Sequence, residues 1–221
     1  MDALLQRTEH ADLDNLLKEV LPAISQAIEG VQRISKIVKA MKEFSHPGGE
    51  SKSATDLNHA IETTIAISRN EWKYVADIET SFAPDLPLVP CFTGEFNQVI
   101  LNLLINAAHA IAGVVGESIE HKGKITITTK RVDDWVEVQI NDTGSGIPEN
   151  IRARIFEPFF TTKEVGKGSG QGLALAHSVI VKKHDGQIWF ESMVGQGSTF
   201  FLRLPLEIPN DLACAAHSGT Q

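Results

Sequence analysis

The sequence has 221 residues, of which 42% are hydrophobic and 22% charged, as in an ordinary globular protein large enough for one α/β core and a smaller element. Its formal net charge of −8 disfavours non-specific binding of nucleic acid, although local cations and backbone amides can still hold a phosphate chain. Two cysteines, Cys91 and Cys214, are too few for a disulfide framework or a zinc site and favour a reduced, cytosolic setting. We find no apolar run that approaches the length of a bilayer span and no signal peptide, so any membrane anchor of a longer parent protein is expected outside this sequence.

The first expected element is a long helix over residues 13–44. Its apolar residues recur at mixed three- and four-residue spacing, which makes a narrow seam of the kind that packs against other helices. The seam consists of Leu13, Leu17, Val20, Ile24, Ala27, Val31, Ile34, Val38 and Met41. Pro22 predicts a kink or a fresh helix start, and the breakers at 45–49 predict the end of the helix.

The rest of the chain alternates between helical and strand patterns. Helices are expected over 56–70, where Asp56 can cap the first turn, over 94–111 and over 172–183. Strands are expected over 75–82, 124–130, 135–141, 187–192 and 199–204, with a glycine-rich loop over 142–170. Because most strands come as hairpins, the pattern predicts an α/β (α+β) fold, a two-layer sandwich with helices on one face of a mixed, largely antiparallel sheet. The expected organisation is a helical region over 1–46, a linker over 47–55, a folded domain over 56–206 and a disordered tail over 207–221.

Polar side chains interrupt the apolar helix expected over 94–111. Asn102, Asn106 and His109 are spaced four and three residues apart, so they share one face of that helix. Carboxamides beside a buried face need hydrogen-bond partners. Taken alone, these residues could serve a ligand, or they could cap loops and bond neighbouring backbone.

Three glycine-rich segments follow, and each has a plain structural interpretation when taken alone. Residues 142–147 follow a strand, and the Asp142 carboxylate can accept a hydrogen bond from an exocyclic amine, although a tight turn would look the same. Residues 166–173 open a helix and offer free N–H groups to an anion, or form only a loop with a glycine cap. Residues 195–200 are a turn into the last strand.

In this order and spacing, the four segments resemble the N, G1, G2 and G3 boxes of the GHKL superfamily, whose members share the Bergerat-type ATP-binding fold. Residues 155–163 resemble the F box that histidine kinases add within the lid over ATP. The resemblance covers roughly residues 56–206 and implies ATP as ligand with Mg²⁺ as its ion. The nucleotide-binding residues that it implies are Asn102, Asn106, His109, Asp142, Gly144, Gly146, Ile147, Lys163, Gly168, Gly170, Gly172, Leu173 and Thr199.

The resemblance also implies separate roles for these residues. Asp142 would bind the adenine amino group, helped by Gly146 and Thr199 through backbone and water. Asn102 would bind Mg²⁺, while Asn106 and His109 would face the ribose and phosphates; family members often have Lys or Arg where His109 stands. Lys163 and the glycine loop would contact the phosphates. Three lid aromatics would anchor the lid by burial rather than touch the nucleotide, namely Phe156, Phe159 and Phe160.

Gln98 stands four residues before Asn102, so the two share a helix face and are expected at the catalytic centre. Superfamily members that hydrolyse ATP commonly carry a glutamate at this position as general base. A glutamine cannot take a proton from water. The site is therefore expected to hold ATP without hydrolysing it quickly, as suits a kinase with another residue as acceptor.

Residues 30–45 resemble the second helix of a histidine kinase dimerisation domain, which predicts a homodimer through residues 13–44. The sequence usual around the phosphoacceptor, a histidine followed by an acidic residue and then a proline, is not found. His10 is followed by Ala11, and His46 lies in a breaker cluster. We therefore expect a fragment that keeps the ATP site and acts on a histidine elsewhere, in a cytoplasmic setting, with the receiver domain of a response regulator as partner.

Four functions are weighed. The first is the catalytic portion of a histidine kinase in a two-component pathway. A serine-directed kinase of the same superfamily is disfavoured by the long N-terminal seam and by the F box. A nucleotide-regulated dimerisation module without catalysis agrees with the missing acceptor but not with intact Asn102 and Asp142. A GHKL ATPase is disfavoured by Gln98.

Overall fold

The computed structural model describes residues 51–116, 121–162 and 170–207, together with Val20 and Ile24. The chain divides into two compact units, Met1–Ser45 and His46–Gln221. Val20 and Ile24 belong to the first unit, where both are helical and partly exposed. The remainder of the helix expected over 13–44 and the tail after residue 207 lie outside the described residues, so the dimer and the domain boundaries stay predictions.

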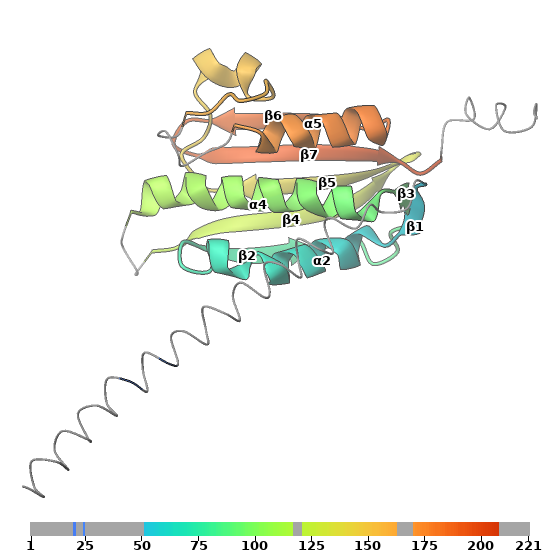
Figure 1. Ribbon diagram of the computed structural model, residues 1–221, viewed down its shortest axis with the longest axis horizontal. Helices are drawn as coiled ribbons and strands as arrows, with labels where there is room; N and C mark the ends of the chain where they lie inside the picture. Colours follow the sequence, from blue (N-terminus) through green and yellow to red (C-terminus); the bar gives the residue numbers. More distant parts are fainter. Residues whose placement is uncertain (1–19, 21–23, 25–50, 117–120, 163–169, 208–221) are drawn as a thin grey trace, which may run out of the picture. The chain divides into compact units, whose positions relative to one another are not determined.

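A five-stranded sheet forms one layer of the second unit (Figure 1). Its strands, in spatial order, are β2 (Ala76–Ser81), β4 (Gly123–Val132), β5 (Trp135–Asp142), β7 (Gly197–Pro205) and β6 (Gln187–Met193). β2 and β4 run parallel, and the other neighbours run antiparallel. The sheet is therefore mixed and largely antiparallel, which confirms the fold class predicted from the hairpins.

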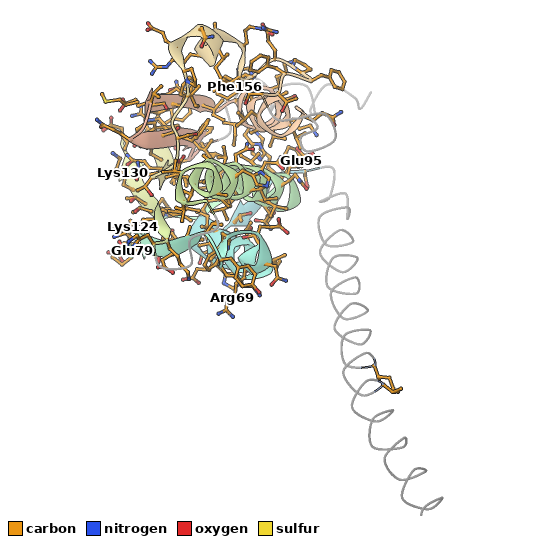
Figure 2. The ribbon with its side chains drawn as sticks, turned by 90° about the vertical axis from the view of Figure 1, so that its left-hand side faces the viewer. Arg69, Glu79, Glu95, Lys124, Lys130 and Phe156 are labelled. Atoms are coloured by element: carbon orange, nitrogen blue, oxygen red, sulfur yellow. The ribbon has the colours of Figure 1, made fainter. Side chains whose placement is uncertain are left out.

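Helices cover one face of this sheet (Figure 1). They are α2 (Leu57–Ile67), the short α3 (Arg69–Trp72), α4 (Thr93–Val115) and α5 (Gly172–His177). The Asp56 carboxylate caps α2 by accepting from the His59 amide at 3.1 Å, as predicted. Figure 2 shows Glu79, Lys124 and Lys130 on the side of the sheet away from α4, so the second sheet face carries polar side chains.

α4 is the central helix of the core. Phe96, Ile100 and Leu103 on this helix are buried against Ile125 and Val138 of the sheet, and full burial of such side chains stabilises the fold by about 1.5–3 kcal/mol each. The helix is five residues longer than predicted, one at its start and four at its end, and Gly116 follows its last residue with a φ of 64° that suits glycine. Among the described residues it is the one helix that is long and apolar enough to cross a membrane by length and composition, a test that a buried core helix also passes.

Short elements depart from the prediction. β1 (Ser53–Thr55) pairs antiparallel with β3 (Val89–Cys91), so a short strand lies within the range expected as linker. The 3₁₀ helix η1 (Glu149–Arg154) interrupts the loop expected over 142–170. Such three- to six-residue elements carry too little periodicity to be recognised in a sequence.

The helix expected over 172–183 changes character halfway. α5 continues as the π-helical segment η2 (Ser178–Lys183), whose wider turn lets the His184 amide donate to the Val179 carbonyl at 3.2 Å. The His184 ring is buried and its Nε2 accepts from the Phe92 amide at 2.9 Å, directly before α4. Burial lowers the pKa of His184, which keeps Nε2 available as an acceptor. The π turn thus places His184, the residue after η2, where its ring can bond the residue before α4.

Candidate nucleotide-binding site

A cavity of about 690 Å³ lies on the helical side of the sheet, and the four predicted segments meet around it. One wall is the polar face of α4, and the other walls are the loop after β5, the start of α5 and the turn between β6 and β7. The predicted binding residues that line it are Asn102, Asn106, His109, Asp142, Gly146, Ile147, Gly170, Gly172 and Leu173. Segments that are distant in the sequence thus come together as predicted.

Asp142 is the last residue of β5 and only 4% exposed. Its Oδ1 accepts from the Gly144 amide at 2.8 Å. Burial raises the pKa of Asp142 to about 6, against the lowering effect of hydrogen bonds from the backbone of Gly144 and Ser198. A buried carboxylate that faces a cavity is a strong acceptor for a donor group on a ligand.

Two glycines allow the loop after β5 to pack tightly. A Cβ at Gly144 would lie 2.6 Å from the backbone of Ala110 on α4. Gly146 has a φ of 71°, and a Cβ there would lie 2.3 Å from the Met193 carbonyl oxygen. Gly144 therefore supports the site without lining the cavity, whereas Gly146 does both.

Polar contacts hold Asn102 in place on α4. Its Nδ2 donates to the Gly172 carbonyl oxygen at 3.3 Å, which joins α4 to the first residue of α5. The Gln98 Nε2 donates to the Asn102 Oδ1 at 3.4 Å. Gln98 is not among the residues that line the cavity, so its contact with the site runs through Asn102.

Thr199 is one predicted site residue that the structure does not bring to the cavity. Alternate residues of a strand point to opposite sheet faces, and on β7 it is Ser198 that lines the cavity. The Thr199 hydroxyl accepts from the Asn141 Nδ2 at 2.8 Å on the other face. The β5–β7 ladder pairs Asp142 with Ser198, and no local sequence pattern indicates that register.

The lid aromatics do not behave alike. Phe156 packs near His177 and Phe190, and Phe160 lines the cavity, so both are partly buried. Phe159 is 72% exposed, and the prediction that it anchors the lid by burial is wrong. Phe159 has a φ of 65°, and Gly170 packs against its backbone. Lys163 and Gly168 lie outside the described residues.

Several lining residues were not predicted because their sequence pattern is that of ordinary core or turn positions. They are Ile105, Ala107, Ala110, Ser145, Pro148, Ile151, Ile155, Thr161, Thr162, Val194, Ser198 and Phe200. Most are small or apolar, so they shape the cavity rather than supply charge. At one end of the cavity Asp142 lies among apolar lining residues, and a flat apolar ligand group with one donor at its edge fits there. We call this the base end of the cavity.

Comparison with known proteins defines the class. A family model described as "Histidine kinase-, DNA gyrase B-, and HSP90-like ATPase" matches residues 94–208, more than half of the chain. The chain therefore belongs to this family of ATP-binding proteins. The match covers α4 from its second residue and includes every residue that lines the cavity.

Relatives place the chain nearer to the histidine kinases within that family. Sensor kinase CckA of Brucella abortus is 32% identical over 200 residues, which cover 83% of this chain but 20% of that protein. The nucleotide-free catalytic domain of histidine kinase ThkA is 30% identical with a TM-score of 0.59, over 70% of this chain and 95% of that domain. A structure of ThkA with the response regulator protein TrrA is 27% identical with a TM-score of 0.57, over 81% of this chain and 49% of that one. The chain thus corresponds to a catalytic domain and spans about a fifth of CckA.

Proposed function

We propose that this chain is the ATP-binding catalytic portion of a sensor histidine kinase, which transfers the γ-phosphoryl group of ATP to a histidine side chain. The observation that carries the proposal is the buried Asp142 carboxylate at a cavity that is also lined by Asn102, Asn106 and His109 of α4. The carboxylate would accept the adenine amino group, and the α4 face would meet the ribose and phosphates.

The α4 carboxamides suit an ion that is bound mainly through phosphates. Asn102 would supply one oxygen ligand to Mg²⁺, an ion that keeps several waters and needs few protein ligands when it accompanies a nucleotide. Among the described residues there is no group of three or more His, Cys, Asp or Glu side chains that could hold a metal ion. A single carboxamide oxygen from Asn102 fits an Mg²⁺ ion that arrives with ATP, and the ion would neutralise charge on the phosphates.

Gln98 favours transfer to a side chain over hydrolysis. Its amide donates to Asn102 and cannot accept a proton from an attacking water. We propose that Gln98 positions Asn102 and leaves the γ-phosphoryl group intact until the acceptor histidine arrives. The site then contributes positioning and charge neutralisation, the main needs of phosphoryl transfer.

Partners follow from the same proposal. The complex of ThkA with a response regulator supports a receiver domain as the downstream partner of this chain. We further propose a homodimer through residues 13–44 and a cytoplasmic site of action, with any membrane anchor carried by a longer parent protein. The acceptor histidine would be presented by a helix of the dimerisation region.

Calorimetric titration with Mg-ATP tests the binding step, and transfer of labelled γ-phosphate to a purified helical hairpin that carries a histidine tests the chemistry. The parent protein should bind and transfer, and Asn102→Ala should lose transfer. Asn141→Ala is the matched control, because this carboxamide bonds Thr199 on the opposite sheet face. A folded parent protein that binds no nucleotide would refute the proposal. Binding without any transfer to histidine would favour the dimerisation module instead.

A further inference from the structure

Arg152 bridges two segments of the cavity wall that are distant in the sequence. It lies on η1 and is half-buried. Its Nε donates to the Ile147 carbonyl oxygen at 3.2 Å, and its Nη2 donates to the Ser192 carbonyl oxygen at 2.6 Å. One guanidinium thus joins the loop after β5 to the end of β6, through the forked donor geometry that lysine lacks.

Ser192 completes the connection with its hydroxyl group. The Ser192 Oγ accepts from the Ile147 amide at 2.7 Å and donates to the Gly197 carbonyl oxygen at 3.1 Å. It also lies 3.0 Å from the Ser198 Oγ. One donor and two acceptor positions of a serine hydroxyl are thereby all in use, so its orientation is determined.

These contacts surround the part of the cavity that holds Asp142. Ile147 and Ser198 both line the cavity, and the backbone of Ser198 hydrogen-bonds Asp142. Gly195 N donates to the Ser145 carbonyl oxygen at 2.9 Å, which ties the same loop to the same turn a second time. η1 has only six residues and no side-chain cap. Within it, the Arg152 side chain bonds both the loop after β5 and the end of β6. Without Arg152, the loop after β5 and the end of β6 would be joined by fewer hydrogen bonds.

We propose that Arg152, acting through Ile147 and Ser192, is a positioning residue that sets the separation of the two walls around the nucleobase. The inference rests on the proposed nucleotide binding and deepens it. The Arg152 hydrogen bonds end on Ile147 and Ser192, at the Asp142 end of the cavity, so Arg152 acts on the adenine moiety. Its loss therefore lowers the affinity for adenosine, ADP and ATP by one common factor.

The test is calorimetric titration of adenosine, Mg-ADP and Mg-ATP into the parent protein, Arg152→Met, Arg152→Lys and Ser192→Ala. Methionine keeps an apolar stem but removes both donors, and we expect about a tenfold loss of affinity for each ligand, as for one lost charge-assisted contact. Lysine can satisfy one carbonyl at most and should lie between. Arg131→Met is the matched control, because the Arg131 Nε donates to the Asp133 carbonyl in the β4–β5 turn.

The outcomes separate the possible errors. Unchanged affinity in Arg152→Met would overturn the inference and leave the proposed function intact. A loss of affinity for ATP alone would also overturn the inference, because it would assign Arg152 to the phosphate end of the site. If the parent protein binds none of the three ligands, both the inference and the proposed function are refuted. If melting curves show Arg152→Met to be unfolded, Ser192→Ala decides, since it removes the hydroxyl bonds and should cause the same uniform loss.

Discussion

β5 carries two buried carboxylates that face opposite sides of the sheet. Asp142 is 4% exposed and faces the cavity, whereas Glu137 is 2% exposed on the side away from the helices. The Lys130 Nζ lies 3.0 Å from the Glu137 Oε1, which also accepts from the Gln139 Nε2 at 2.7 Å, and the Arg203 Nε donates to the Glu137 Oε2 at 2.7 Å. Burial would raise the pKa of Glu137, but these hydrogen bonds and the Lys130 charge outweigh it and lower the pKa. Burial raises the pKa of Asp142 to about 6, because backbone amides offset it only in part.

The difference separates a residue of the framework from a residue of the site. Glu137 is compensated within the protein and joins β4, β5 and β7 across the open face. Asp142 keeps part of its hydrogen-bonding capacity for something that enters the cavity, and the unliganded protein carries the cost of that buried charge. Neutralising each carboxylate with its own amide should therefore give opposite results.

The largest expected effect is on nucleotide affinity. Asp142→Asn should weaken Mg-ATP binding about 100-fold, since a hydrogen bond to a charged acceptor contributes about 1.5–3 kcal/mol and the new amide presents a donor to the adenine amine. Calorimetric titration measures this loss. Glu137→Gln is the control and should bind as the parent does. Equal loss in both variants would contradict the division of roles.

The next effect is on stability. Glu137→Gln should lower the free energy of unfolding by about 2–3 kcal/mol at pH 7, because the amide meets the donors of Arg203 and Lys130 with one acceptor instead of two. The lowered pKa of Glu137 makes its contribution present above the ordinary pKa of 4.5 and lost as the pH falls through the folded value. Urea denaturation at pH 7 and at pH 3 measures the difference, which should shrink at the lower pH.

The smallest effect is a gain. Asp142→Asn should raise the free energy of unfolding of the unliganded protein by about 1–2 kcal/mol at pH 8, less than the full cost of the buried charge because the amide is itself buried. The pKa of Asp142 is raised from 3.8 to about 6, so this gain should be complete above about pH 6 and vanish below about pH 4. Thermal melting across this range checks it, and a variant less stable than the parent at pH 8 would show that Asp142 is a framework residue after all.

The hairpins, the long apolar helix and the meeting of the four segments were predictable. Strand alternation in 124–130 and 135–141, and the helical spacing of Asn102, Asn106 and His109, are local patterns with a defined geometric consequence. Thr199 and Phe159 show the limit of such patterns. One residue of register separates Thr199 from the cavity face, and Phe159, at a positive φ, is exposed. Neither a strand face nor a loop dihedral can be assigned from residue types alone.

From the order of amino acids alone follow the family, the fold class and the chemistry of the main binding groups, because periodicity and glycine spacing are properties of neighbouring residues. The tertiary structure decided which side chains face the cavity, and it made Asp142 and Glu137 opposites. It also joined Arg152 to Ser192 across 40 residues of sequence. These features depend on desolvation and on contacts between distant segments, which arise only when the chain is packed.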